Sequence, residues 1–171
     1  MTDDNITGLL PKGKTIKVSK GYTGEIEVIH FLGSGLTSEV YEGRLLDHPN
    51  RPRVALKARK ELRGIEVARA RELFRSEAEI LARLPSEEKK ANPLRGLPVD
   101  AHVGAHHYGV GNYEGAEFLI MEFIDGRRVM DLIDESPDGR LPEKQALTVG
   151  LWLFHTLDLL HTQLNKSYID L

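Results

Sequence analysis

Hydrophobic and polar positions alternate along the first part of the chain in short runs that predict β-strands. Such runs cover residues 15–18, 26–32, 39–46 and 53–59. A Gly-Ser-Gly segment separates the second run from the third, and two runs joined by a short glycine-containing loop predict a β-hairpin. The turn-rich residues 47–52 then lead into the fourth run. We therefore expect an antiparallel sheet, with at most one short strand in a polar N-terminal extension, residues 1–22.

The alternation gives way to a helical period between residues 65 and 84. Apolar residues recur there at spacings of three and four, at Ala70, Leu73, Phe74, Ile80, Leu81 and Leu84. This pattern is typical of one face of a helix. We expect Pro85 to end the helix, because a proline removes a backbone hydrogen bond and crowds the preceding turn. Residues 85–101 are then expected to form a polar loop.

Two further strands and two helices are expected in the second half of the chain. The strands cover about residues 102–110 and 116–123, with 111–115 as their connection. A short helix is expected at 129–135, and a longer one near Pro142, a favourable residue in a first helical turn.

Apolar residues cover nearly every face of this longer helix: Leu147, Val149, Leu151, Trp152, Leu153, Phe154, Leu157, Leu159 and Leu160. A helix that is apolar all round is typically buried on all sides. Little sequence follows it, so we expect a core helix of a longer protein. A surface that binds another molecule is the alternative.

Composition narrows the class of protein. The chain has 171 residues, of which 40% are hydrophobic and 29% charged, as in ordinary globular proteins. A net charge of −3 gives no electrostatic sign of nucleic-acid binding. The basic residues around Arg51 and at 57–60 are more simply a solvated strand end. No apolar run approaches the about 20 residues that span a membrane, and the absence of cysteine fits a reducing compartment. We expect a soluble cytoplasmic protein.

The first candidate for chemistry is the segment Gly33-Ser34-Gly35, between two predicted strands. Glycines let the backbone approach a ligand closely, and successive amides can cradle phosphate oxygens. A hairpin turn softened by glycine explains the same residues.

Lys57 is the second candidate. Period-two alternation places it on the same face as Ala55 and opposite to Leu56. From a central strand its ammonium would reach a phosphate. From a strand edge it would extend into solvent.

Glu77 stands out because it projects from the middle of the apolar stripe of the 65–84 helix, whereas Glu79 lies on the opposite side. A carboxylate in such a place is costly unless it is paired with a cation. Lys57, on the sheet that this helix would cover, is the natural partner. A position at the margin of the stripe, with the carboxylate in water, is the alternative.

The histidines suggest no metal site. His102 and His106 are four residues apart and His107 is adjacent, a spacing that suits a metal on a helix. In a predicted strand the first two share a face but lie far apart. No metal is therefore expected there.

Four motifs occur in a fixed order: Leu-Gly-Ser-Gly-Leu-Thr-Ser-Glu-Val-Tyr at 32–41, Val-Ala-Leu-Lys at 54–57, Phe-Arg-Ser-Glu-Ala-Glu-Ile-Leu at 74–81 and Leu-Ile-Met-Glu-Phe-Ile-Asp-Gly at 119–126. In this order the chain resembles eukaryotic-type serine/threonine protein kinases, the bacterial ones in particular, over about residues 23–171.

The resemblance implies an α+β fold in three parts. A kinase small lobe, with about five antiparallel strands and one long helix, would cover residues 23–121. A hinge would follow at 122–127. The first helices of the helical large lobe would occupy 128–171.

The resemblance also implies an ATP site. Gly33 and Gly35 match the first two glycines of the loop over the phosphates, and Ser38 replaces the third. Lys57 matches the lysine on the α- and β-phosphates, and Glu77 its ion-pair partner. The positions matched to nucleotide contacts are Leu32, Gly33, Ser34, Gly35, Ser38, Val40, Ala55, Lys57, Met121, Glu122, Ile124 and Asp131.

These positions have distinct implied roles. Val40 and Ala55 would sandwich the adenine, with Met121 as the gatekeeper at the back of the pocket. The hinge backbone from Glu122 to Ile124 would hydrogen-bond the base. Asp131 would lie near the ribose.

The last residues resemble the start of the kinase catalytic loop. Tyr168-Ile169-Asp170-Leu171 aligns with His-Arg-Asp-Leu, which makes Asp170 the candidate base for the substrate hydroxyl. Tyr168 and Ile169 depart from the family, and without the arginine the usual anchor of a phosphorylated activation loop is missing. The family's Mg²⁺ ligands would follow Leu171, so we expect little activity from this chain alone.

The resemblance implies ATP- and Mg²⁺-dependent phosphorylation of serine or threonine in an unidentified protein substrate, by the complete protein. Two alternatives remain open. One is a pseudokinase-like nucleotide-binding or scaffold module, which Tyr168 and Ile169 favour. The other is a kinase-like small-molecule phosphotransferase, although the Val-Ala-Leu-Lys and hinge motifs favour protein kinases. The residues after Leu171 would separate the first alternative from an active enzyme.

Overall fold

A computed structural model describes residues 8–18, 22–60, 66–88 and 105–163 of the chain. The chain folds as two units, one formed by Met1–Ala82 and Ala105–Ile124, the other by Arg83–Gly104 and Asp125–Leu171. The first unit contains a sheet whose strands are β1 (Lys14–Val18), β2 (Gly24–Ser34), β3 (Ser38–Leu45), β4 (Arg53–Arg59), β5 (His107–Tyr113) and β6 (Ala116–Glu122).

The sheet is antiparallel throughout, in the order β1-β2-β3-β4-β6-β5. The predicted α+β class is confirmed. Six strands are present where about five were expected, because Lys14–Val18 pairs with β2 along its whole length, from Lys14 opposite Val28 to Val18 opposite Gly24.

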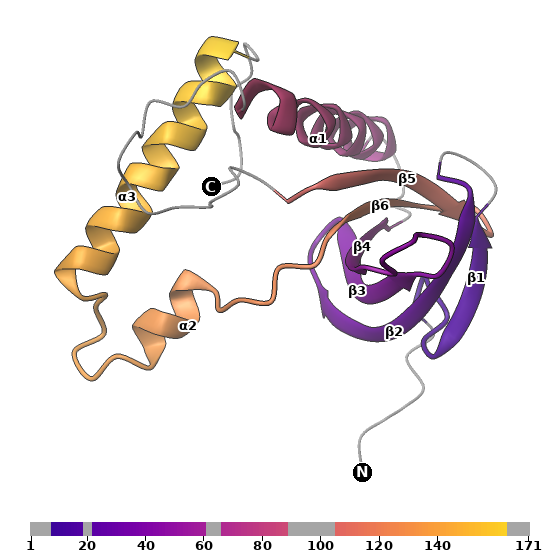
Figure 1. The fold of residues 1–171 in the computed structure, drawn as a ribbon, viewed down its shortest axis with the longest axis horizontal. Coiled ribbons are helices and arrows are strands. Elements are labelled where there is room, and N and C mark those ends of the chain that lie inside the picture. The colour runs from indigo at the N-terminus through magenta and orange to yellow at the C-terminus, as the bar shows by residue number, and fades with distance from the viewer. Residues whose placement is uncertain (1–7, 19–21, 61–65, 89–104, 164–171) are drawn as a thin grey trace. The chain divides into compact units, whose positions relative to one another are not determined.

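The sheet curls so that its two outer strands approach each other (Figure 1). The Tyr22 N–H, in the connection between β1 and β2, donates a hydrogen bond to the Val110 carbonyl of β5, at 2.7 Å. The hydrophobic core lies inside this curl and includes Ile16, Val18, Ile26, Val28, Tyr41, Leu45, Val54, Leu56, Phe118 and Ile120. Each such side chain contributes about 1.5–3 kcal/mol when it leaves water.

The alternation predicted for β4 is confirmed. Val54, Leu56 and Ala58 are fully buried in the core, and Ala55 and Lys57 point to the outer face of the curl. Strand register continues this outer face across the sheet, because Val40 of β3 and Leu119 of β6 lie opposite Lys57.

The β5–β6 hairpin is tighter than expected. The strands extend to Tyr113 and from Ala116, so only Glu114 and Gly115 form the turn, both with positive φ (48° and 92°). A two-residue turn of this kind matches the twist of the strands. Gly111, expected in the loop, belongs to β5, where it lies opposite Phe118 of β6. A glycine is needed at this position because a Cβ there would lie 2.5 Å from the Phe118 ring. β5 also begins at His107, later than the predicted 102, and residues 102–104 lie outside the described part.

Helix α1 (Glu66–Glu88) continues through Pro85, contrary to the prediction. A proline loses its own amide donor and crowds the preceding turn, but only three residues of the helix follow it, Ser86 to Glu88, and their N–H groups can still donate to carbonyls one turn earlier. Residues 85–88 of the predicted loop are therefore helical, and its remainder lies outside the described residues.

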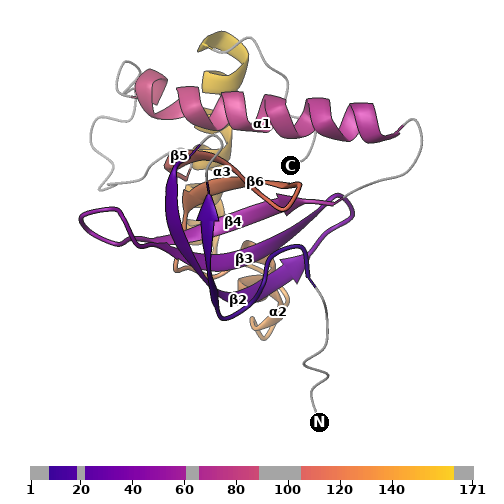
Figure 2. The ribbon, with the colours of Figure 1, turned by 90° about the vertical axis from the view of Figure 1, so that its right-hand side faces the viewer.

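The apolar stripe of α1 is narrower than the sequence predicts. Phe74 is buried, but Leu73 is 47% exposed. The sheet has its core inside its own curl, so α1, beside β5 and β6 in Figures 1 and 2, covers only the outer face. A few side chains of the helix are enough for that contact.

The second unit contains α2 (Val129–Asp134), α3 (Glu143–Asp158) and the π-helical turn η1 (Leu159–Gln163). Both helices lie close to their predicted positions. Large apolar side chains of α3 face solvent, with Leu147 62% and Phe154 72% exposed, while Leu160 in η1 is buried. None of the helices in the described ranges combines the length and apolar character required to cross a membrane.

Candidate nucleotide-binding site

An ion pair joins β4 to α1 on the outer face of the sheet. The Lys57 Nζ donates to both Glu77 carboxylate oxygens, at 2.6 and 2.8 Å. The contact expected from the sequence is therefore present. Glu77 is 36% exposed, however, so it lies at the margin of the helix face and not within an apolar stripe. Half-exposed pairs contribute about 0–1 kcal/mol to stability, so this one mainly sets where the ammonium lies.

An apolar surface adjoins the ion pair. Val40 lies opposite Lys57, and Ala55 lies opposite Met121 across neighbouring strands. All of these side chains point to the outer face and are partly exposed. The structure thus brings together four of the positions expected at a nucleotide, as an apolar surface with a cation at one side. Such a surface suits a flat base attached to an anionic group.

The tip of the β2–β3 hairpin is open. The Gly35 N–H donates to the Ser38 carbonyl at 2.8 Å and closes the turn. A Cβ on Gly33 would meet nothing within 4 Å, and one on Gly35 only the Ser38 carbonyl, at 3.9 Å. Neither glycine has a positive φ. Neither backbone conformation nor packing within the described residues therefore requires glycine here, and the hairpin tip leaves open space beside both positions.

The other residues of this hairpin differ in exposure. Leu32 is 44% exposed on β2, and Ser34 is also exposed. Ser38, in the place of the family's third glycine, is buried. The expected phosphate-binding residues therefore lie on one hairpin, most of them accessible from solvent.

The expected hinge begins where β6 ends. The Glu122 N–H donates to the His106 carbonyl at 2.7 Å, and the Glu122 carboxylate accepts from the His106 N–H at 3.1 Å. Ile124 is 68% exposed. Glu122 is thus held by the residue preceding β5. The next N–H, of Phe123, donates to the Arg53 carbonyl at 3.4 Å, and Ile124 is open to solvent.

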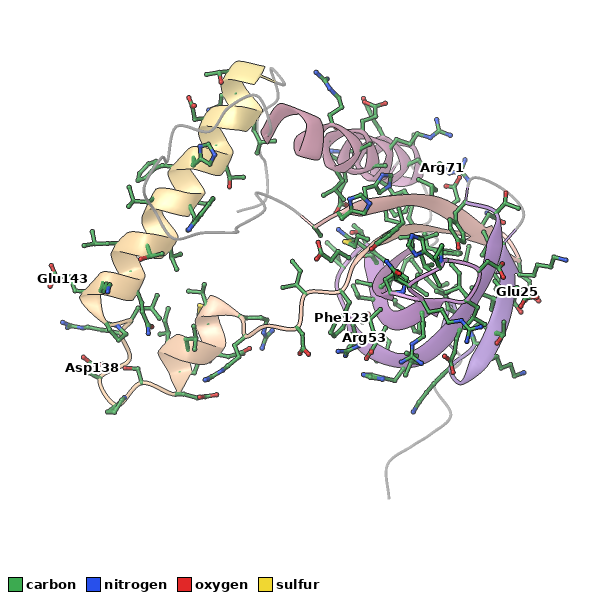
Figure 3. The ribbon with its side chains drawn as sticks, viewed as in Figure 1. Glu25, Arg53, Arg71, Phe123, Asp138 and Glu143 are labelled. Carbon is green, nitrogen blue, oxygen red and sulfur yellow. The ribbon has the colours of Figure 1, made fainter. Side chains whose placement is uncertain are left out.

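Sequence reasoning missed a charged cluster beside the hinge. Glu42 of β3 is 4% exposed, and its carboxylate accepts from the Arg53 Nε at 2.6 Å. The Arg53 guanidinium lies over the Phe123 ring, 4.1 Å from its centre, and the two side chains lie next to each other in Figure 3. Alternation from Val40 places Glu42 on the same face, a signal that could have identified it.

Lys60 was also missed, because the basic run at 57–60 looked like a solvated strand end. This interpretation was wrong. Arg59 is 5% exposed and pairs with the Glu117 carboxylate at 3.3 Å. The Lys60 Nζ donates to the Ser34 Oγ at 2.5 Å and to the Gly35 carbonyl at 2.8 Å. Both basic residues are thus engaged with the protein.

Two expected site residues do not belong to the described residues of the first unit. Asp131 belongs to the second unit, where its carboxylate accepts from the Arg128 guanidinium at 2.6 Å. This hydrogen bond lowers the pKa of Asp131 below its ordinary value. Asp170 lies outside the described residues, as does His102. No group of three or more metal-ligating side chains occurs in the part of the chain that the structure describes.

Comparison with known proteins identifies the fold. No protein-family profile and no curated protein matches the chain. The solved structure of vaccinia related kinase 3 matches with a TM-score of 0.63 at 20% identity, over 90% of this chain and 43% of its own. The kinase domain of PknI from M. tuberculosis matches with a TM-score of 0.62 at 20% identity, over 90% and 51%. The chain has a protein-kinase-like fold.

The kinase-like chain spans about half the length of these two solved structures, 43% and 51%. At 20% identity the match concerns the fold. It includes the curled antiparallel sheet, α1 and the first helices that follow the strands. What the site binds has to be argued from its own residues.

Proposed function

We propose that the first unit binds ATP, and that the complete protein transfers the γ-phosphate to serine or threonine of a protein substrate. The observation that carries this proposal is the Lys57–Glu77 ion pair, next to an open glycine hairpin and an apolar surface. An ammonium held in place by a carboxylate is suited to orient phosphate oxygens, and phosphoryl transfer depends mainly on such positioning.

In this proposal the base lies against Val40, Ala55 and Met121, and the backbone of Glu122 and Ile124 hydrogen-bonds its edge. Lys57 contacts the α- and β-phosphates. Asp131 lies near the ribose, and Asp170 orients the substrate hydroxyl. The phosphates are covered by the hairpin residues Leu32, Gly33, Ser34, Gly35 and Ser38. The kinase-like fold supports this arrangement, and the roles of the individual residues belong to the proposal.

Mg²⁺ would accompany ATP, because it neutralises the charge that develops on the phosphates. We expect its protein ligands in the part of the kinase-like fold that follows Leu171. A cytoplasmic setting, expected from the lack of cysteine, would supply both ATP and Mg²⁺.

Isothermal calorimetry with ATP, with and without Mg²⁺, tests the nucleotide site on this chain. The Lys57→Met variant removes the phosphate cation, so we expect its affinity for ATP to fall about 10- to 100-fold. Lys14→Met, an exposed lysine on β1, is the matched control and should bind as the wild type does. A folded wild-type chain with no saturable ATP binding would contradict the proposal.

Transfer itself is tested on a longer protein that includes the residues after Leu171. Phosphorylation of protein serine or threonine supports the kinase function. Nucleotide binding without turnover would favour the scaffold module, and phosphorylation of small molecules alone would favour the phosphotransferase.

A further inference from the structure

We propose that Lys60 is a positioning residue of the nucleotide site, which holds the glycine hairpin in the free protein and contacts the terminal phosphates of a bound nucleotide. This inference rests on the proposed ATP site. Lys60 belongs to none of the motifs that predict that site, and only its contacts in the structure bring it to attention.

Lys60 makes three hydrogen bonds to the hairpin tip. Its Nζ donates to the Ser34 Oγ at 2.5 Å and to the Gly35 carbonyl at 2.8 Å. Its backbone N–H donates to the Thr37 carbonyl at 2.9 Å. Leu36, between these acceptors, is 89% exposed. The hairpin tip is therefore held by polar contacts with Lys60 more than by side-chain packing.

The position of Lys60, one residue after the end of β4, fits the terminal phosphates. Ala55, Lys57 and Lys60 follow one another along the strand direction, and the partner of Arg59 across the sheet is Ser38 at the hairpin tip. At about 3.3 Å per residue, Lys60 lies about 10 Å beyond Lys57. A nucleotide with its base at Ala55 and its first phosphates at Lys57 therefore extends toward Lys60.

The charge of Lys60 is available to such a ligand. Lys57 and Arg59 each pair with a carboxylate, from Glu77 and Glu117 respectively. The acceptors of Lys60 among the described residues, a hydroxyl and a carbonyl, are uncharged. Hydrogen bonds from an ammonium to phosphate oxygens are stronger than those to neutral acceptors, and the flexible lysine stem presents three donors. A phosphate can therefore draw the ammonium from Ser34 while the Gly35 contact remains.

The test compares nucleotides with different numbers of phosphates. Calorimetry on this chain would measure the affinities for ATP, ADP and AMP of the wild type and of Lys60→Gln. We expect the affinity for ATP to fall about tenfold, that for ADP to fall less, and that for AMP to stay within twofold. Lys60→Arg should retain most of the ATP affinity. Lys14→Met is again the control for loss of one positive charge.

Ser34→Ala separates the two roles of Lys60. It alters a residue of the proposed phosphate loop and removes one acceptor of the ammonium but keeps the charge of Lys60, so any loss of ATP affinity should be smaller than that in Lys60→Gln. This variant and Lys60→Arg also test the proposal if Lys60→Gln fails to fold.

Three outcomes would overturn the proposal. They are equal losses for ATP, ADP and AMP in Lys60→Gln, no loss of ATP affinity in that variant, and a loss in Ser34→Ala as large as in Lys60→Gln. Failure of the wild type to bind any nucleotide is a different result, because it removes the ATP site itself.

Discussion

The buried carboxylate of Glu42 connects the sheet to the hinge through two further side chains. Glu42 accepts from the Arg53 Nε at 2.6 Å, and the His30 Nε2 lies 3.2 Å from its other oxygen. Arg53 in turn covers the ring of Phe123. A buried carboxylate is costly when it loses its cation, so Arg53 has both a structural partner on β3 and an aromatic one at the hinge.

Arg53→Met should therefore destabilise the chain by about 1–3 kcal/mol, because it leaves Glu42 without its closest cation. Urea unfolding would measure the change. Arg44→Met is the matched control on the neighbouring strand, because Arg44 is 44% exposed and pairs with a half-exposed Glu27 at 3.7 Å. It should change the free energy of unfolding by less than about 0.5 kcal/mol. Equal losses in the two variants would contradict this role of Glu42.

His107 gives the chain a dependence on pH. Its Nε2 is buried without a hydrogen-bond partner among the described residues, and burial lowers the pKa of His107 below the ordinary value of about 6.5. The folded state favours the neutral ring, whereas the unfolded chain takes up a proton near pH 6.5. The contribution of neutral His107 to the free energy of unfolding is thus fully present above about pH 6.5. It is lost as the pH falls from there toward the lower pKa that His107 has in the folded state.

We expect His107→Phe to lose less stability than the wild type between pH 7 and pH 5. The measurement is the free energy of unfolding in urea at several pH values. Parallel curves for the two proteins would show that His107 does not cause the acid sensitivity.

At the scale of elements, the N-terminal segment is part of the sheet's core. Leu10 is 1% exposed, and the Leu9 N–H donates to the Glu39 carboxylate at 3.0 Å. The same carboxylate accepts from the Tyr41 hydroxyl at 2.5 Å. Burial, and next the hydrogen bond to Glu39, raises the pKa of Tyr41 to about 12. Leu9 and Leu10, before β1, are thereby fixed to β3, next to the glycine hairpin.

Leu10→Ala should cost about 2–4 kcal/mol of stability, as is usual when a buried leucine is truncated. Thermal or urea unfolding would measure it. Leu36→Ala, at an 89% exposed position, is the control and should be nearly neutral. If the two variants unfold alike, the N-terminal segment does not contribute to the core.

The accuracy of the sequence predictions differs among these elements for physical reasons. The bounds of β4 were predicted to the residue, because its inner face is buried and its outer face is not, so alternation is strong. Leu10 could not be placed in the core, because the pair Leu9-Leu10 within a polar segment shows no helical or strand period. The end of α1 was predicted wrongly because the helix continues for three residues beyond Pro85, a continuation that proline disfavours and that the sequence pattern does not indicate.

The candidate site was predicted in the same uneven way. Motif order brought Lys57 and Glu77 to attention, and the two side chains are paired. The contacts of Arg53 and Lys60 depend on strand register and on the position of the β2–β3 hairpin tip beside the end of β4. Strand register cannot be read from a single sequence, so the sequence gives no sign of these contacts.

At the scale of the whole molecule, the exposed side of α3 is the main apolar feature of the second unit. Leu147, Leu151 and Phe154 are 62%, 49% and 72% exposed. Large exposed apolar groups on a protein surface promote association. We therefore expect this chain, when isolated, to self-associate through α3.

The double variant Leu147→Gln/Phe154→Gln should raise the dissociation constant of the self-association at least several-fold, with little change in ATP binding. Sedimentation would measure the change. Leu36→Gln, which alters an exposed leucine of the first unit, should leave the association unchanged. A chain that is monomeric without any substitution would contradict the prediction.

The hydrogen bond from Tyr22 to Val110 has a consequence for how the sheet meets other chains. The outer strands of an open sheet present unpaired backbone groups, to which a foreign strand can add and start aggregation. Here the N–H of Tyr22, in the connection between β1 and β2, donates to a carbonyl of β5, the other outer strand. This hydrogen bond from Tyr22 thus shields part of the edge backbone of β5 from pairing with a strand of another molecule.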